Sequence, residues 1–413
     1  MQLTRRAALL GLTSAFTLGR ASLALAGRAS TLPHGQRFVV VILRGALDGM
    51  AAVVPYGDRD LAGWRANLVP PGPGAAGGVF DLGGFYGLHP ELAGLHEMYA
   101  AGELLPIHAV AGSYRSRSHF EAQDYLESGA DHRMTSGWLN RAVGLLPAAG
   151  RGNSPGGPAL AVGSSMPLLL RGPATVGSWA PPTPAYEGME PDLYARVAAL
   201  ARTDKLIGPA LDEGLRERGF TDAVLAGAAP PPQRDRAAFP VLAGFAGRML
   251  AAADGPRIAA LEIGGWDTHA GQVGRLKAAL RQLDHGLVAL RTELGQSWRR
   301  TVVLAITEFG RTVRMNGTNG TDHGTGTVAF VLGGVVAGGV VRANWPGLDA
   351  ADLLEARDLR PTTDLRSVAK GLLAQHLNLP EPALARVFPD SAAARPMHGL
   401  VRAAGTPSEI SLR

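Results

Sequence analysis

Residues 38–49 read FVVVILRGALDG, six apolar residues followed by a short segment that contains glycine and aspartate. A continuous apolar, β-branched run without polar alternation is typical of a parallel strand buried on both faces of its sheet. Sites in open α/β sheets lie beyond the carboxyl ends of such strands. Asp48, just after this run, is therefore the first candidate site residue.

Similar runs predict further strands at 104–110, 257–263, 301–306 and 328–332. Between 273 and 294, leucine and valine recur every three or four residues, which predicts an amphipathic helix. Further helices are expected at about 92–98, 118–127, 190–203, 207–218 and 362–378. This alternation predicts an α/β fold with a mostly parallel sheet sandwiched between helices.

The chain begins with the features of a twin-arginine export signal, residues 1–26. Arg5 and Arg6 precede a mild apolar run, and an A-x-A cleavage sequence ends at residue 26. A buried N-terminal helix is the alternative. The signal predicts a periplasmic or secreted protein that uses the twin-arginine export machinery. A main domain is expected at 36–392, with an irregular Pro- and Gly-rich insertion or cap at about 146–235, followed by a tail at 393–413.

Composition excludes several classes of protein. The formal net charge is +5, and part of it comes from the arginines of the export signal. No basic stripe with interleaved aromatic residues is present, so no nucleic-acid partner is expected. No uninterrupted apolar run approaches about 18 residues, which argues against a membrane span in the mature chain. The chain has no cysteine, so disulfides, thiolate metal sites and cysteine nucleophiles are excluded.

Acidic and histidine residues gather at the other predicted strand ends. Asp267 and His269 follow one strand, Glu308 follows the next, and Asp322 and His323 precede the last. Carboxylates and imidazoles suit a hard or borderline divalent ion. In an extended segment, Asp267 and His269 point the same way. Each residue alone also fits a turn or a hydrogen-bonded loop.

Ser118 begins a predicted helix and has two interpretations. With Glu121 it forms the pattern of a capping box, which needs no function. A helix N-terminus also attracts phosphate or sulfate, and a serine near a metal ion can act as a nucleophile. Arg115 and Arg117, just upstream, are candidates for holding the anion.

The motifs LRGALDG, RSRSHFEAQDYLESG, TSGWLNR, GGWDTHAGQ, TEFGRT and TDHGTGT occur in this order. Together they closely resemble an exported bacterial family, domain of unknown function 1501, over roughly 36–392. That family looks like a branch of the alkaline-phosphatase/sulfatase superfamily. The resemblance implies an alkaline-phosphatase-like fold, two neighbouring divalent ions (Zn, Mg, Mn or Ca) and a serine or threonine nucleophile at a helix N-terminus.

The resemblance also implies roles for individual residues. Ser118 matches the nucleophile. Asp48 and Glu308 match ligands of one ion. The residues that match the other ion's ligands are Asp267, His269 and His323, and Asp322 and His119 are expected in a supporting layer around the ligands.

Two departures from the superfamily stand out. Asp267 and His269 are separated by one residue instead of three, and Phe309 stands where the superfamily commonly has a histidine. Since phenylalanine cannot bind a metal, the second ion or its identity is in doubt.

The resemblance implies an exported metal-dependent hydrolase acting on small-molecule or polymer esters of phosphate or sulfate. A non-catalytic exported binding or assembly protein that retains the fold is the main alternative. A nucleotide-dependent oxidoreductase has only glycine-rich stretches such as 332–339 in its favour. No G-x-G-x-x-G follows a strand and opens a helix.

Overall fold

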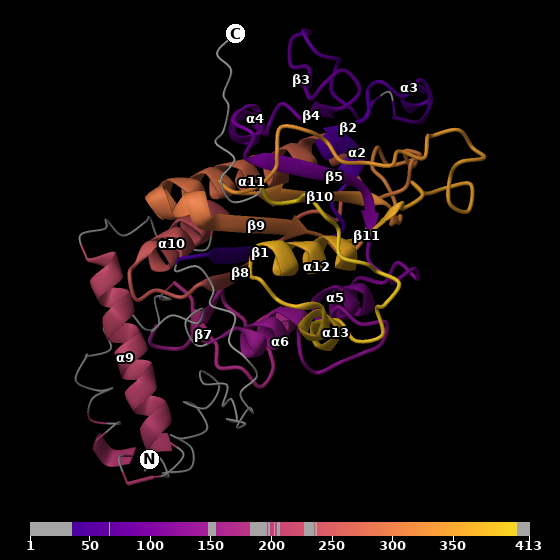
Figure 1. Cartoon of the computed structure of the whole chain (residues 1–413). Helices are drawn as coiled ribbons and strands as arrows, with labels where there is room; N and C mark the ends of the chain where they lie inside the picture. The colour runs from indigo at the N-terminus through magenta and orange to yellow at the C-terminus, as the bar shows by residue number, and fades with distance from the viewer. Residues whose placement is uncertain are drawn as a thin grey trace, which may run out of the picture.

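The computed structural model describes residues 35–402, except 66, 148–153, 182–195, 197–198, 202, 205–206, 227–234 and 236–237. An eight-stranded sheet, in the order β11-β5-β10-β9-β1-β8-β6-β7, runs through the molecule (Figure 1). Its strands are β1 (Arg37–Leu43), β5 (Leu104–Ala111), β6 (Ala159–Val162), β7 (Gly177–Trp179), β8 (Ile258–Ile263), β9 (Thr301–Ile306), β10 (Thr327–Leu332) and β11 (Thr363–Asp364).

Helices cover both faces of the sheet (Figure 1). On one face lie α4 (Ala93–Ala100), α10 (Phe239–Ala251) and α11 (Gln272–Leu294); on the other lie α5 (His119–Ser128), α6 (Trp138–Leu145), α12 (Leu365–Gln375) and α13 (Glu381–Val387). Alternate β1 side chains enter different cores: Val39 and Val41 join the first, and Val40 and Ile42 the second. The α/β fold class is thus confirmed.

Further elements lie outside the main sheet and the helices that cover it. A three-stranded sheet contains β2 (Val53–Val54), β4 (Gly87–Leu88) and β3 (Phe80–Asp81). The remaining helices are α2 (Gly49–Ala52), α3 (Leu61–Arg65), α9 (Ile207–Leu225) and the 3₁₀ segments η2 (Leu168–Leu170) and η5 (Gly295–Arg300). Among the described residues, no helix combines the length and the apolar character needed to cross a membrane.

Strand direction brings distant loops together. β1 pairs in parallel with β8 and β9, β6 pairs in parallel with β8 and β7, and β5 pairs in parallel with β11. Only β10, within this sheet, runs antiparallel to its neighbours β9 and β5. The loop before β10 therefore meets the loops that follow β1, β5, β8 and β9 at one edge. The candidate site residues lie in these loops, except His119, which begins α5 directly after the loop that follows β5.

The region at 146–235 differs from the expected irregular insertion. Its apolar pieces form β6 and β7, which extend the main sheet beyond β8. The helix α10 was also not predicted. It packs against α11, on the face of the sheet that α4 and α11 cover. The export signal predicted at 1–26, most of the helix expected at 190–203 and the end of the expected C-terminal tail lie outside the described residues.

Candidate metal centre at the carboxyl edge of the sheet

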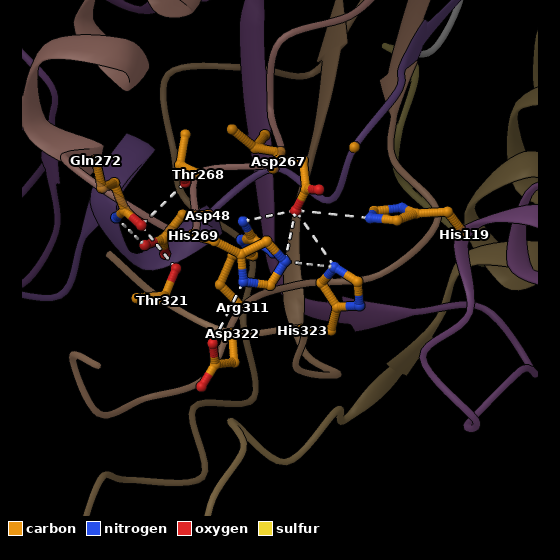
Figure 2. Close-up of polar contacts among 12 residues, drawn as sticks. Asp48, His119, Asp267, Thr268, His269, Gln272, Arg311, Thr321, Asp322 and His323 are labelled. Carbon is orange, nitrogen blue, oxygen red and sulfur yellow. Dashed lines mark hydrogen bonds and ion pairs between the residues drawn. The ribbon is translucent and has the colours of Figure 1, made fainter. Parts of the chain in front are cut away.

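One carboxylate oxygen lies at the middle of the cluster. Asp267 Oδ1 is 3.0 Å from His269 Nε2, 3.0 Å from Arg311 Nη2, 3.3 Å from His323 Nε2 and 3.6 Å from His119 Nε2 (Figure 2). These residues come from the loops after β8 and β9, the loop before β10 and the start of α5. Parts of the chain that are far apart in sequence therefore place their polar groups around one point.

The arrangement fits a divalent metal ion. One ligand atom from each of His119, Asp267 and His323 lies within 4.8 Å of the others. His269 Nε2 is 3.0 Å from His323 Nε2, and both nitrogens lie close to Asp267 Oδ1. His119 Nε2 is buried and has no hydrogen-bond partner among the described residues. Three imidazoles and a carboxylate are a donor set that Zn²⁺ and similar ions accept, and an ion here would satisfy the orphaned nitrogen.

Glu308 lies behind His119 and orients it. Its side chain is fully buried, and Oε1 is 2.8 Å from His119 Nδ1. The same oxygen accepts hydrogen bonds from Gly45 N at 2.9 Å and Gln123 Nε2 at 3.2 Å, and Oε2 accepts one from the Thr307 hydroxyl at 2.9 Å. From the sequence, Glu308 was expected to bind a metal and His119 to lie in the layer behind. In the structure His119 faces the cluster, and Glu308 is the buried carboxylate behind the ring.

The other two rings are held in the same manner. His323 Nδ1 is 2.9 Å from the carbonyl oxygen of Arg117, a residue with a positive φ of 60°. His269 Nδ1 is 3.3 Å from Asp322 Oδ1. A carbonyl or carboxylate on Nδ1 favours the tautomer whose Nε2 lone pair is free. All three Nε2 atoms therefore point inward as acceptors.

The pKa shifts of Asp267 and His323 suit metal binding, whereas that of His119 favours the protonated ring, whose proton a metal ion would have to displace. The hydrogen bond to Glu308 and its charge raise the pKa of His119. Burial lowers the pKa of the His323 imidazole, which keeps it neutral. Burial alone would raise the pKa of Asp267, but the charges of Arg311 and His269 outweigh it and lower the pKa. An ionised carboxylate and a neutral imidazole are the forms that bind metals.

Asp48 belongs to a separate, closed network. Its carboxylate is fully buried and accepts two hydrogen bonds from Arg65 Nη1, at 2.8 and 2.7 Å. Gln272 Nε2 donates to Oδ2 at 2.6 Å, and the Ala51 amide donates to Oδ1 at 3.3 Å as the N-cap bond of α2. Both oxygens are occupied by protein donors, so Asp48 presents no free ligand atom to an ion.

Ser118 is the N-cap residue of α5, as predicted, but the capping box does not form. Its side chain makes no capping hydrogen bond. Glu121 instead accepts a hydrogen bond from the Tyr114 hydroxyl. The half-buried Ser118 side chain contacts the Tyr114 hydroxyl instead of capping α5, and it lies directly before His119 of the cluster.

Both predicted anion-binding arginines are engaged within the protein. Arg115 donates to the carbonyl oxygens of Gly112 and Tyr114 in its own loop. Arg117 Nε donates to Asp358 at 2.9 Å, and its Nη2 also contacts Glu355. Their side chains are therefore not directed at the cluster.

Glycines let the loops of the site approach one another. Gly45 has φ of +117°, and a Cβ there would lie 2.8 Å from the Asp267 amide nitrogen. A Cβ at Gly320 would lie 2.3 Å from the His269 carbonyl carbon. No larger residue fits at either position, so close packing of the loops explains the glycine of the LRGALDG motif and the glycine that precedes the TDHGTGT motif.

A cleft adjoins the cluster. Its volume is about 520 Å³, and Asp267 forms part of its wall together with Arg44, Phe239, Ile263, Gly264, Gly265, Arg275, Ala278, Ala279 and Gln282. Arg44 is paired with Glu127 and Glu262. Arg275 is exposed on α11 and makes no ion pair with a described residue. The cleft is largely apolar with one free positive charge.

Sequence reasoning missed two arginines of this region, Arg65 and Arg311. Arg65 ends a short helix within an irregular stretch, where nothing indicates its partner. Arg311 stands in the quoted TEFGRT motif, three residues after Glu308, and that proximity was the available signal.

Comparisons with known proteins identify a family. The model of the family described as "Protein of unknown function (DUF1501)" matches residues 104–388. No curated protein matches the chain. Among solved structures, it is similar to phosphonate monoester hydrolase of Agrobacterium radiobacter, with 12% identity over 84% of this chain and 74% of that one and a TM-score of 0.35. It is also similar to Ps i-CgsB in complex with k-i-k-neocarrahexaose, with 8% identity over 75% and 68% of the chains and a TM-score of 0.36.

Proposed function

The chain belongs to the DUF1501 family, and from that premise we propose that it is a metal-dependent hydrolase of phosphate or sulfate esters. The convergence of His119, Asp267, His269 and His323 on one point carries the proposal. Each ring is oriented through its second nitrogen, as in metal centres in general.

His119, Asp267 and His323 would hold the ion, with His269 as the nearest further ligand. A divalent ion in this place polarises an ester oxygen and lowers the pKa of a neighbouring hydroxyl. Ser118 is the proposed nucleophile, because its hydroxyl is free of the capping role and adjoins a ligand. The backbone amides at the start of the ten-residue helix α5 would face the negative charge of the ester group. Arg115 and Arg117 are not assigned this task, since other protein groups hold them.

The cleft beside Asp267 is the proposed place for the leaving group. Its apolar wall suits a ring or chain, and it is open enough for part of a polymer. We further propose that residues 1–26 direct twin-arginine export and that the protein works in the periplasm or outside the cell. Passage in the folded state suits a protein that receives its metal before export.

A panel of phosphate and sulfate esters, assayed with Zn²⁺, Mn²⁺, Mg²⁺ or Ca²⁺, tests the proposal. We expect hydrolysis of at least one ester class, loss of activity with chelator, and recovery when metal is restored. Ser118→Ala should lower kcat by at least about 1,000-fold while metal content stays unchanged. Ser116→Ala, in the same loop, is the matched control. Full activity in Ser118→Ala would refute the nucleophile assignment.

A second function, a non-catalytic exported binding or assembly protein, is favoured by the closed Asp48–Arg65 network. That network removes the first-strand aspartate from metal chemistry. If this alternative is correct, Asp267→Ala will lose the metal without unfolding, and no ester in the panel will be hydrolysed by the wild-type protein.

A further inference from the structure

The Arg311 side chain is the least satisfied charged group of the centre. It is fully buried, and none of its three guanidinium nitrogens makes a well-formed hydrogen bond to a described residue. Its close contact is the ion pair with Asp267 Oδ1 at 3.0 Å (Figure 2). Asp48 and Asp322 act on the same guanidinium electrostatically. Burying a permanently charged arginine costs free energy unless nearby groups compensate its charge. Arg311 has little compensation, which indicates that its charge is used in the site.

Asp48 and Glu308, the two carboxylates that were expected to bind a second ion, are not arranged to do so. Both oxygens of Asp48 are taken by Arg65 and Gln272. Glu308 is taken by His119 and by backbone and side-chain donors. Neither carboxylate offers a free lone pair in the direction of the cluster.

The residue after Glu308 excludes a further ligand. Phe309 is buried and stacks on the His119 ring, with centroids 4.9 Å apart and an interplanar angle of 30°. It also lies 5.1 Å from the His323 ring centroid. Phe309 therefore packs two rings of the first ion's ligand set in place.

We propose that the centre holds one divalent ion per chain and that the Arg311 guanidinium supplies the positive charge that a second ion provides in a two-ion centre. This inference rests on the metal dependence in the proposed function. It replaces the two ions that the superfamily resemblance implies. Arg311 cannot bind a metal, so it shares Asp267 with the single ion and repels a second one.

Metal stoichiometry of the natively exported protein tests the inference. The protein is saturated with Zn²⁺ or Mn²⁺, freed of excess ion by gel filtration and measured by elemental analysis. One ion per chain is expected. Two ions per chain would overturn this inference and leave the hydrolase proposal intact, whereas none would overturn the metal dependence itself.

Titration calorimetry of Arg311 variants tests the charge. Arg311→Met should bind the ion about tenfold more tightly, because a competing cation is removed from Asp267. Arg311→Lys should bind like wild type. Arg314→Met is the matched control, since Arg314 lies over the Trp64 ring, 4.7 Å from its centroid. Unchanged or weaker binding by Arg311→Met would refute the role of Arg311. If Arg311→Met does not fold, the wild-type stoichiometry still tests whether the centre holds one ion, and Arg311→Lys still tests whether a positive charge at this position is enough.

Discussion

Asp48 and Asp267 differ in the cation that neutralises them. The Asp48 side chain is fully buried against Arg65, whereas that of Asp267 is 45% exposed and surrounded by imidazoles. We expect Asp48→Asn to retain the ion and to lower the free energy of unfolding by about 3–5 kcal/mol, because it leaves the Arg65 charge buried and unpaired. Urea unfolding and elemental analysis of the same preparation measure both effects.

Asp267→Asn is the control at the same scale. It should lose the ion, and because it also removes the close ion pair of the buried Arg311, the stability of the metal-free protein is measured beside that of Asp48→Asn. Loss of the ion in Asp48→Asn, with stability unchanged, would contradict the structural role of Asp48.

The position of a site residue was easier to predict than its partner. Asp267, His269 and His323 follow from the rule that sites lie at strand ends. Whether Glu308 faces a metal or the His119 ring depends on where α5 packs, and no local sequence pattern predicts that position. Arg65 likewise meets Asp48 only through the course of an irregular loop.

At the scale of elements, α9 carries a pH-sensitive contact. Glu217 lies against a glycine before β6 and another within β7: a Cβ at Gly156 or Gly177 would approach its carboxyl atoms within 2.7 and 2.4 Å. Burial and the nearby charge of Glu213 raise the pKa of Glu217 to about 7. The folded state therefore holds this proton more tightly, so the contact is fully stable below pH about 4.5 and weakens as pH rises through 7.

Hydrogen exchange of the α9 amides, corrected for intrinsic rates, checks this prediction. Protection should be greater at pH 5 than at pH 8, by up to about 3 kcal/mol. Glu217→Gln should remove the difference, and Asp222→Asn, an exposed residue of the same helix, should keep it. Equal protection of wild-type α9 at both pH values would show that Glu217 does not control the contact.

Elements with a strong pattern were predicted to within a residue or two. β1, β5, β8, β9 and β10 are continuous apolar runs, and α11 has a clear stripe. β6 and β7 have four and three residues between glycine-rich segments, too few to show a period. α10 is apolar on nearly all sides, so no stripe marks it. The reversed direction of β10 has no signature in its side chains.

At the scale of the whole molecule, the same two cores that build the sheet bury histidines in a neutral form. His108 Nε2 lies 3.0 Å from the Val53 carbonyl oxygen, and His376 Nε2 lies 2.8 Å from that of Arg37. Burial lowers the pKa of His89, His108 and His376 to about 4 each. The unfolded chain regains the ordinary value near 6.5 and so binds more protons between these limits.

Stability should therefore be full above pH about 6.5 and fall as the pH drops towards 4, because acid favours the state that binds protons. Each buried histidine contributes up to about 1.4 kcal/mol per pH unit, or about 4 kcal/mol per unit for the three together. Urea unfolding of Glu217→Gln between pH 7.5 and 4.5, with chelator present throughout, separates this effect from acid release of the metal and from the opposite titration of Glu217. In that background His376→Gln should flatten the slope by about a third, while the exposed His132→Gln should leave it unchanged. A stability of Glu217→Gln that stays constant from pH 6.5 to 4.5 would mean that these histidines are protonated in the folded protein, and that their burial does not set its acid limit.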